Sequence, residues 1–130
     1  CWYGGARGVA RTLARAAAKR DVGPHALAHL GAVDIALRTT RAALVRAAEE
    51  IDADPGDLRG EGALRVRALG EAAASDVLAR TGRALGAGPL SHDGARSRAV
   101  ADLTVYLRQH HAERDLARLG ELVAEHGAAW

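Results

Sequence analysis

The stretch PHALAHLGAVDIALRTTRAALVRAAEEID, residues 24–52, carries the clearest structural signal in the chain. A leucine or isoleucine recurs in it every seven residues, at Leu30, Leu37, Leu44 and Ile51, with Leu27, Val33 and Ala48 beside this row. A seven-residue apolar repeat turns one side of an α-helix toward other helices. Pro24 suits the first turn of such a helix. We therefore predict a long helix over 24–52 that packs through this row in a helical bundle.

Three more helices are predicted around this one. Their expected ranges are 5–20, 60–85 and from 95 through YLRQHHAERDLARLG, residues 106–120. Glycine, proline and aspartate separate the helices, notably in the turn Asp54-Pro55-Gly56-Asp57. Short connections between long helices indicate antiparallel neighbours. The predicted fold class is all-α, an up-and-down antiparallel four-helix bundle, and residues 1–130 are expected to form a single domain.

The composition narrows the class of protein. The chain has 130 residues, 48% of them hydrophobic and 26% charged, which is enough to bury the core of one domain. Basic and acidic residues are interspersed, so we do not expect the one-sided basic face of a nucleic-acid-binding protein. No apolar run of about 18 residues and no signal-peptide pattern occurs, so no membrane partner is expected. Because Cys1 is the only cysteine, we expect a reducing, cytoplasmic location.

Two adjacent histidines, His110 and His111, are the first candidates for chemistry. His111 and Asp115 are four residues apart, so their side chains would meet on one face of a helix. A histidine held by a carboxylate is the arrangement of a general base. An ordinary surface pair on a solvated helix is the alternative. Sequence alone leaves both interpretations open.

Other patterns have simpler interpretations. His25 and His29 have metal-ligand spacing, but no third or fourth ligand is evident nearby, so we predict a polar helix face and no metal site. Gly86 and Gly88 would let backbone amides approach a phosphate, although a plain turn between helices explains them as well.

The aromatic residues are few: Trp2, Tyr3, Tyr106 and Trp130. Three of them are close to the ends of the chain, which indicates packing on another domain or subunit.

Three segments, in this order, resemble the C-terminal helical domain of the acyl-CoA dehydrogenase superfamily of flavoenzymes. Residues 19–24, KRDVGP, are similar to the family's R-x-x-F-G turn, with Lys19 in place of the arginine. Residues 85–90, LGAGPL, are similar to its G-G-x-G-F/Y loop, with Gly86 and Gly88 matching. Residues 98–102, RAVAD, are similar to its R-x-x-R-D segment, with Arg98 and Asp102 matching.

The resemblance implies that this chain, which starts at Cys1 rather than Met, is the C-terminal part of a longer FAD-dependent enzyme. The parent would dehydrogenate an acyl-CoA thioester with FAD as cofactor and an N-terminal and a middle domain as partners. The family is homo-oligomeric, and Lys19, Gly86 and Gly88 fall where it contacts the cofactor. The family's catalytic glutamate would fall at His110, so His110 or His111 is the implied acid/base residue. A flavin-dependent monooxygenase of the same fold and a non-catalytic oligomerisation module are the alternatives.

Overall fold

The computed structural model describes residues 1–19, 21–54 and 60–128, and within them the chain forms six helices and no strand. The prediction of an all-α fold is confirmed. The helices are α1 (Trp2–Lys19), α2 (Gly23–Ala53), α3 (Glu61–Leu85), α4 (Gly88–His92), α5 (Gly94–Leu107) and α6 (Ala112–His126). The predicted helix end at Arg20, the turn residues Pro55, Gly56 and Asp57, and Trp130 lie outside the described residues.

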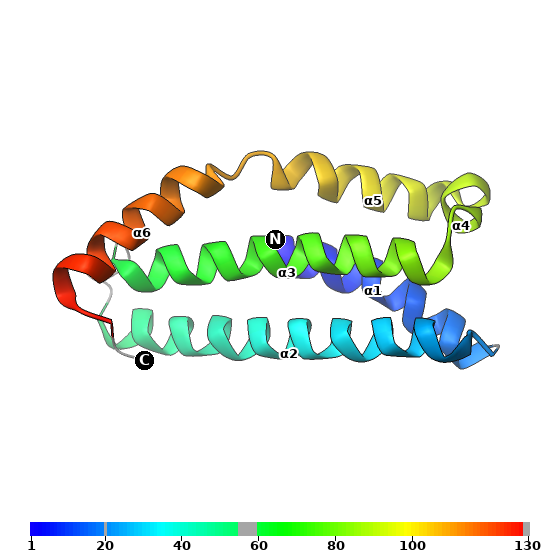
Figure 1. The fold of residues 1–130 in the computed structure, drawn as a ribbon, viewed down its shortest axis with the longest axis horizontal. Helices are drawn as coiled ribbons and strands as arrows, with labels where there is room; N and C mark the ends of the chain where they lie inside the picture. Colours follow the sequence, from blue (N-terminus) through cyan, green and yellow to red (C-terminus); the bar gives the residue numbers. More distant parts are fainter. Residues whose placement is uncertain (20, 55–59, 129–130) are drawn as a thin grey trace.

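The long helices lie side by side (Figure 1). α2 and α3 run antiparallel along the length of the molecule, and α5 lies along another side of α3. α1 passes behind α3 and contacts α2, α3 and α5. α6 leaves the line of α5 and turns down toward the start of α3. The ranges predicted for the second and third helices agree with α2 and α3 to within one residue at each end.

The core consists mostly of small side chains, as the scarcity of aromatic residues requires. Its buried hydrophobic residues are Ala6, Val9, Ala10, Leu13, Ala26, Val33, Ala73, Ala74, Val77, Leu103 and Leu107. Small residues let helix axes approach closely, and Gly5 of α1 lies in such a close contact with α5. A Cβ atom added to Gly5 would lie 2.9 Å from Cδ1 of Leu103. α1 also begins earlier than predicted, at Trp2, because the Gly5 N–H donates to the Cys1 carbonyl at 3.0 Å.

The buried face of α2 has the predicted seven-residue period, but other residues than the predicted leucines and isoleucine form its centre. The buried residues of this helix are Ala26, Val33 and Thr40, which are seven residues apart. The leucines of the predicted row are half-buried at positions 30, 37 and 44, and Ile51 is 40% exposed. Side chains smaller than leucine therefore occupy the buried face of α2, and the leucines of the predicted row are only half-buried.

The prediction of one continuous helix from residue 95 to about 120 is wrong. α5 ends at Leu107, and α6 begins only at Ala112. The amides of Arg108 and His110 donate to the carbonyls three residues earlier, at 3.0 and 3.1 Å, which is the tighter 3₁₀ pattern. His111 then leaves the helical region with φ −87° and ψ 57°. His110 and His111 are consequently in a helix break and not on a regular helical face.

α6 closes against the start of α3 through a histidine–glutamate pair. Nδ1 of His126 lies 2.6 Å from Oε1 of Glu61. This hydrogen bond holds the pKa of the Glu61 carboxyl below its ordinary value of 4.5, with Arg65 acting in the same direction and desolvation opposing it. The pair joins the last turn of α6 to the first turn of α3.

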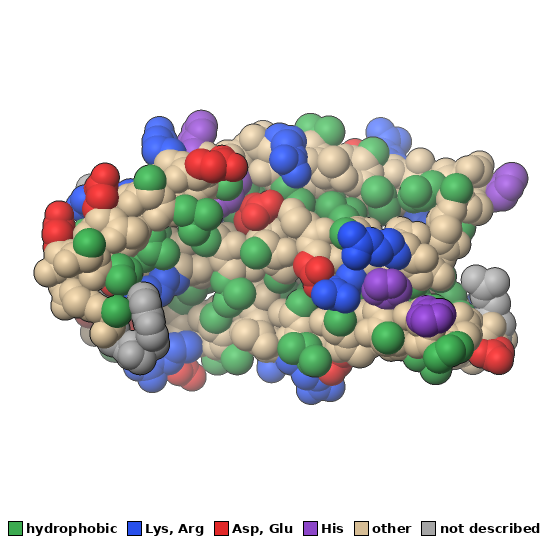
Figure 2. All heavy atoms as spheres, viewed as in Figure 1, with side chains coloured by type: hydrophobic (Ala, Val, Ile, Leu, Met, Phe, Trp, Pro, Cys, Tyr) green, Lys and Arg blue, Asp and Glu red, His purple; other side chains and the backbone are tan. Residues whose placement is uncertain are grey.

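The visible surface mixes the two signs of charge (Figure 2). Basic and acidic side chains alternate there with exposed hydrophobic ones. Ile35 and Val105 are 68% and 69% exposed. Among the residues that the structure describes, no helix combines the length and the apolar character needed to cross a lipid bilayer.

Candidate functional site

The helix break turns one of the two histidines into the molecule. The side chain of His110 is only 2% exposed, whereas His111 is exposed. Nε of Arg67, on α3, donates a hydrogen bond to Nδ1 of His110 at 3.1 Å. Because Nδ1 accepts this bond, the neutral imidazole carries its own proton on Nε2. His110 therefore presents an N–H donor on the other side of its ring.

Asp115 completes the polar part of the site. Its Oδ2 lies 3.5 Å from Nδ1 of His110 and 3.6 Å from Nε of Arg67, and its side chain is 17% exposed. The carboxylate thus balances the charge of Arg67 beside a nearly buried imidazole. The predicted partner of Asp115 was His111, but the imidazole beside this carboxylate is that of His110. His111 contributes its backbone carbonyl, which accepts from the Asp115 N–H at 2.9 Å.

Aromatic side chains pack beside His110. The indole of Trp2 meets the His110 ring edge-on, with centroids 5.3 Å apart at 61°, and meets the Tyr106 ring at 6.2 Å. The Arg67 guanidinium lies 5.0 Å from the centroid of the same indole, a cation–π contact. We call Trp2, Arg67, Tyr106, His110 and Asp115 the His110 cluster. It joins α1, α3, α5 and α6 at one point.

The His110 cluster borders an open apolar groove of about 460 Å³. Trp2, Arg67 and Tyr106 line the groove together with small aliphatic residues of α2 and α3, among them Leu44, Ile51 and Val66. A groove of this size, mostly apolar and with few polar groups, suits a small organic ligand. His110 is not among the lining residues, but its ring contacts two of them, Trp2 and Arg67.

Lys19, Gly86 and Gly88, the residues implied to contact a cofactor, lie at the other end of α5. All three are exposed, at the end of the molecule where α1 and α3 terminate and α4 begins (Figure 1). Gly86 has φ +69°, a conformation that favours glycine, and the space above the Cα of Gly88 is open to 4 Å. The 14 residues of α5 separate this end from the His110 cluster by about 20 Å.

Arg67 is a member of the site that was not predicted from the sequence. Trp2 and Tyr106 were interpreted as contacts to another domain, and the structure places both within the chain's own site, with Tyr106 still 41% exposed. Arg67 is one of many arginines, and only the fold brings it to a residue 43 positions away. Among the described residues, no group of three or more His, Cys, Asp or Glu side chains is arranged to hold a metal ion.

Comparison of the chain with protein-family models, with curated proteins and with solved structures finds no match. The functional interpretation therefore depends on the geometry above and on the segments quoted from the sequence.

Proposed function

We propose that this chain is the C-terminal helical domain of a longer FAD-dependent oxidoreductase similar to the acyl-CoA dehydrogenases, with α1, α2, α3 and α5 as an up-and-down four-helix bundle. One observation carries the proposal. The position at which the resemblance expects the catalytic acid/base residue, His110, is also where the helix breaks and where a nearly buried imidazole meets Arg67 and Asp115. Catalytic side chains are commonly placed on such irregular segments between rigid helices.

In the proposed reaction a base would remove the α-proton of an acyl-CoA thioester, and FAD, when bound, would supply the acceptor for the β-hydride. His110 takes up a proton through Nδ1 once Arg67 releases it, and the Arg67 side chain, 47% exposed, has room to turn. Arg67 also lines the groove, where its positive charge would stabilise negative charge that develops on the substrate. His111, exposed beside the cluster, is the second candidate for the acid/base role.

The cofactor residues fit an FAD molecule shared between chains. Lys19 supplies a positive charge for a phosphate, and the open space at Gly88 lets a ligand approach the backbone. Because these residues are exposed at one end of the molecule, the rest of the FAD site would come from a second copy and from the N-terminal and middle domains of the parent. Exposed hydrophobic residues such as Ile35 and Val105 suit contacts with those partners.

A visible absorption spectrum of the parent protein, expressed from its natural start codon, tests the proposal. We expect bound flavin that bleaches when an acyl-CoA is added anaerobically. A colourless protein that takes up no added FAD would contradict both flavoenzyme interpretations. The parent is expected to be cytoplasmic.

A flavin-dependent monooxygenase of the same fold is the second candidate. The observation that favours it is the hydrogen bond from Arg67, which occupies Nδ1 of His110 and leaves the ring its Nε2–H as a donor toward other groups. Oxygen consumption by the reduced flavoprotein, without bleaching by acyl-CoA, would select this alternative.

A non-catalytic oligomerisation module is the third candidate. It is favoured by the burial of His110, whose ring is 2% exposed and has partners that would be sufficient for a purely structural role. This candidate predicts that the parent binds no FAD and that substitutions at His110 alter stability alone.

A further inference from the structure

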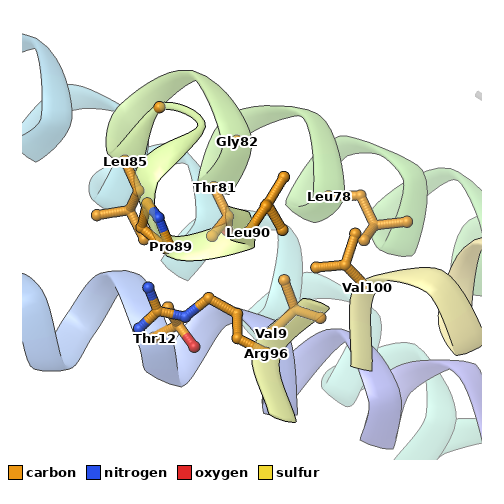
Figure 3. A pocket seen from close by; sticks show the side chains of 11 residues that line it. Val9, Thr12, Leu78, Thr81, Gly82, Leu85, Pro89, Leu90, Arg96 and Val100 are labelled. Atoms are coloured by element: carbon orange, nitrogen blue, oxygen red, sulfur yellow. The ribbon is translucent and has the colours of Figure 1, made fainter. Parts of the chain in front are cut away.

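A second cavity, separate from the His110 cluster, lies between α1, α3, α4 and α5 (Figure 3). Its volume is about 50 Å³, and its walls are mostly apolar, with Val9, Leu78, Leu85 and Val100 among them. Three polar side chains, those of Thr12, Thr81 and Arg96, also line it. The hydroxyl of Thr81 and Nε of Arg96 are both buried, and neither has a hydrogen-bond partner among the described residues. Buried polar atoms in folded proteins are nearly always satisfied by protein, water or ligand.

Thr81 differs in this respect from the other threonines whose hydroxyl bonds are known. Thr40 and Thr104 donate to the carbonyls of Ala36 and Val100, four residues earlier, at 2.8 and 2.7 Å. The Thr81 hydroxyl does not use this local partner, although the residue is only 5% exposed. Its hydrogen is therefore available to a group in the cavity.

Arg96 reaches the same cavity from the first turn of α5. Its side chain extends toward Thr12 (Figure 3) and is 23% exposed. The nearest carboxylate oxygen, Oδ2 of Asp93, is 3.9 Å from Nε, which is too long for a hydrogen bond. A guanidinium only donates hydrogen bonds, so this N–H also requires an acceptor.

We propose that this cavity binds a monocarboxylate of two or three carbons. The two unsatisfied groups are both donors, and one is cationic, so they match the oxygens of a carboxylate. The aliphatic walls match a methyl or ethyl group. A volume of about 50 Å³ accommodates roughly three to five water-sized groups, the size of acetate or propionate. Leu90, 40% exposed, lies at the accessible side of the cavity.

Titration of the 130-residue chain with propionate, followed by methyl NMR of Val9, Leu78 and Val100, tests the proposal. We expect saturable shifts with a Kd on the order of 1 mM, the range open to so small a ligand. Propionamide, equal in shape and neutral, should bind at least about tenfold more weakly. Thr81→Val and Arg96→Gln should each weaken propionate binding by about tenfold. The matched control, Thr40→Val, removes a buried hydroxyl outside the cavity and should leave the affinity unchanged.

Absence of saturable shifts would leave water as the only occupant and overturn the proposal. Equal binding of propionate and propionamide would overturn it as well, and this comparison needs only the unsubstituted chain if a variant fails to fold. Equal affinities of the unsubstituted chain and of folded Thr81→Val and Arg96→Gln variants would place the ligand elsewhere and have the same consequence. The experiment contains no flavin, so its failure leaves the proposed oxidoreductase function as it stands.

Discussion

Arg67 and His110 are 43 residues apart in sequence and are joined by a 3.1 Å hydrogen bond from Nε to Nδ1. The bond fastens the break between α5 and α6 to the middle of the molecule. Trp2 packs against both side chains, so the first turn of α1 depends on the same contact. The His110 cluster therefore has a structural role whether or not the parent uses it in chemistry.

His110→Ala should lower the free energy of unfolding by about 1–3 kcal/mol. The variant loses an aromatic contact, worth about 0.5–1.5 kcal/mol, and a hydrogen bond of similar value. Urea denaturation followed by circular dichroism measures the change. The matched control is His111→Ala, which removes an exposed imidazole one residue away and should change stability by about 0.5 kcal/mol or less.

A double-mutant cycle with Arg67→Ala and His110→Ala isolates their interaction. We expect a coupling energy of about 0.5–3 kcal/mol, as for other residues in one network. Strictly additive effects of the two substitutions would show that the bond contributes nothing to the fold.

Gly5→Ala should destabilise the protein, although alanine is the better helix former. The new Cβ would lie 2.9 Å from Cδ1 of Leu103, so α1 and α5 or the leucine must shift. Such overpacking costs about 1–3 kcal/mol, against a gain in helix propensity of about 1 kcal/mol. Gly8→Ala is the control, because its Cβ would meet nothing within 4 Å, and it should raise stability by about 0.5–1 kcal/mol. Thermal unfolding of the two variants should therefore shift in opposite directions.

Asp93→Ala should weaken the start of α5. Asp93 is the N-cap residue, and its Oδ1 accepts from the Arg96 N–H at 3.1 Å. Loss of an aspartate cap costs about 1 kcal/mol. Asp102→Ala, on the same helix, removes only an exposed ion pair with Arg98 at 3.9 Å and should cost about 0.5 kcal/mol or less. Equal losses in chemical denaturation would refute the capping role.

Stability should decline in acid partly through Glu61. Its pKa in the folded protein is lowered, first by the hydrogen bond from His126 and further by Arg65, so folding favours the ionised carboxylate. This contribution is fully present above the unfolded value near 4.5 and is lost as pH falls through the lower folded pKa. The difference in stability between the unsubstituted chain and Glu61→Gln should therefore shrink as pH falls from about 5 toward 3. In a His126→Ala background the same difference should change less with pH, because the largest cause of the lowered pKa of Glu61 is gone, and an unchanged decline there would exclude the pair as the cause.

The long helices could be predicted because their ends are marked in the sequence. Gly23 and Pro24 open α2, and Gly86 ends α3 with a positive φ, so local chemistry sets these boundaries. The interruption after Leu107 has no such mark, since residues 106–119 contain neither glycine nor proline. Its cause is tertiary, because His110 turns inward to meet Arg67 and Trp2, which come from other helices.

In the candidate site, too, the local features could be predicted from the sequence and the tertiary contacts could not. Position 110 could be selected from the sequence because the adjacent histidines are a local feature and because the resemblance implies an acid/base residue there. The partners of His110 could not, since an arginine every few residues gives no reason to prefer Arg67. The cavity at Thr81 was equally hidden, because a helical threonine normally hydrogen-bonds to its own backbone, as Thr40 does.

Substitution of the two histidines in the proposed parent enzyme separates their proposed roles. His110→Gln should lower kcat by roughly 10²–10⁴-fold, the range for loss of a general acid or base, while flavin content stays unchanged. It should also remove one limb of the pH–rate profile, which a merely structural role would not do. His111→Gln is matched in chemistry and adjacent in sequence, and we expect the smaller effect from it because the resemblance implies position 110 for the acid/base residue. If both variants catalyse the reaction at the original rate with an unchanged pH–rate profile, neither histidine is the acid/base residue. The His110 cluster then has a structural role alone.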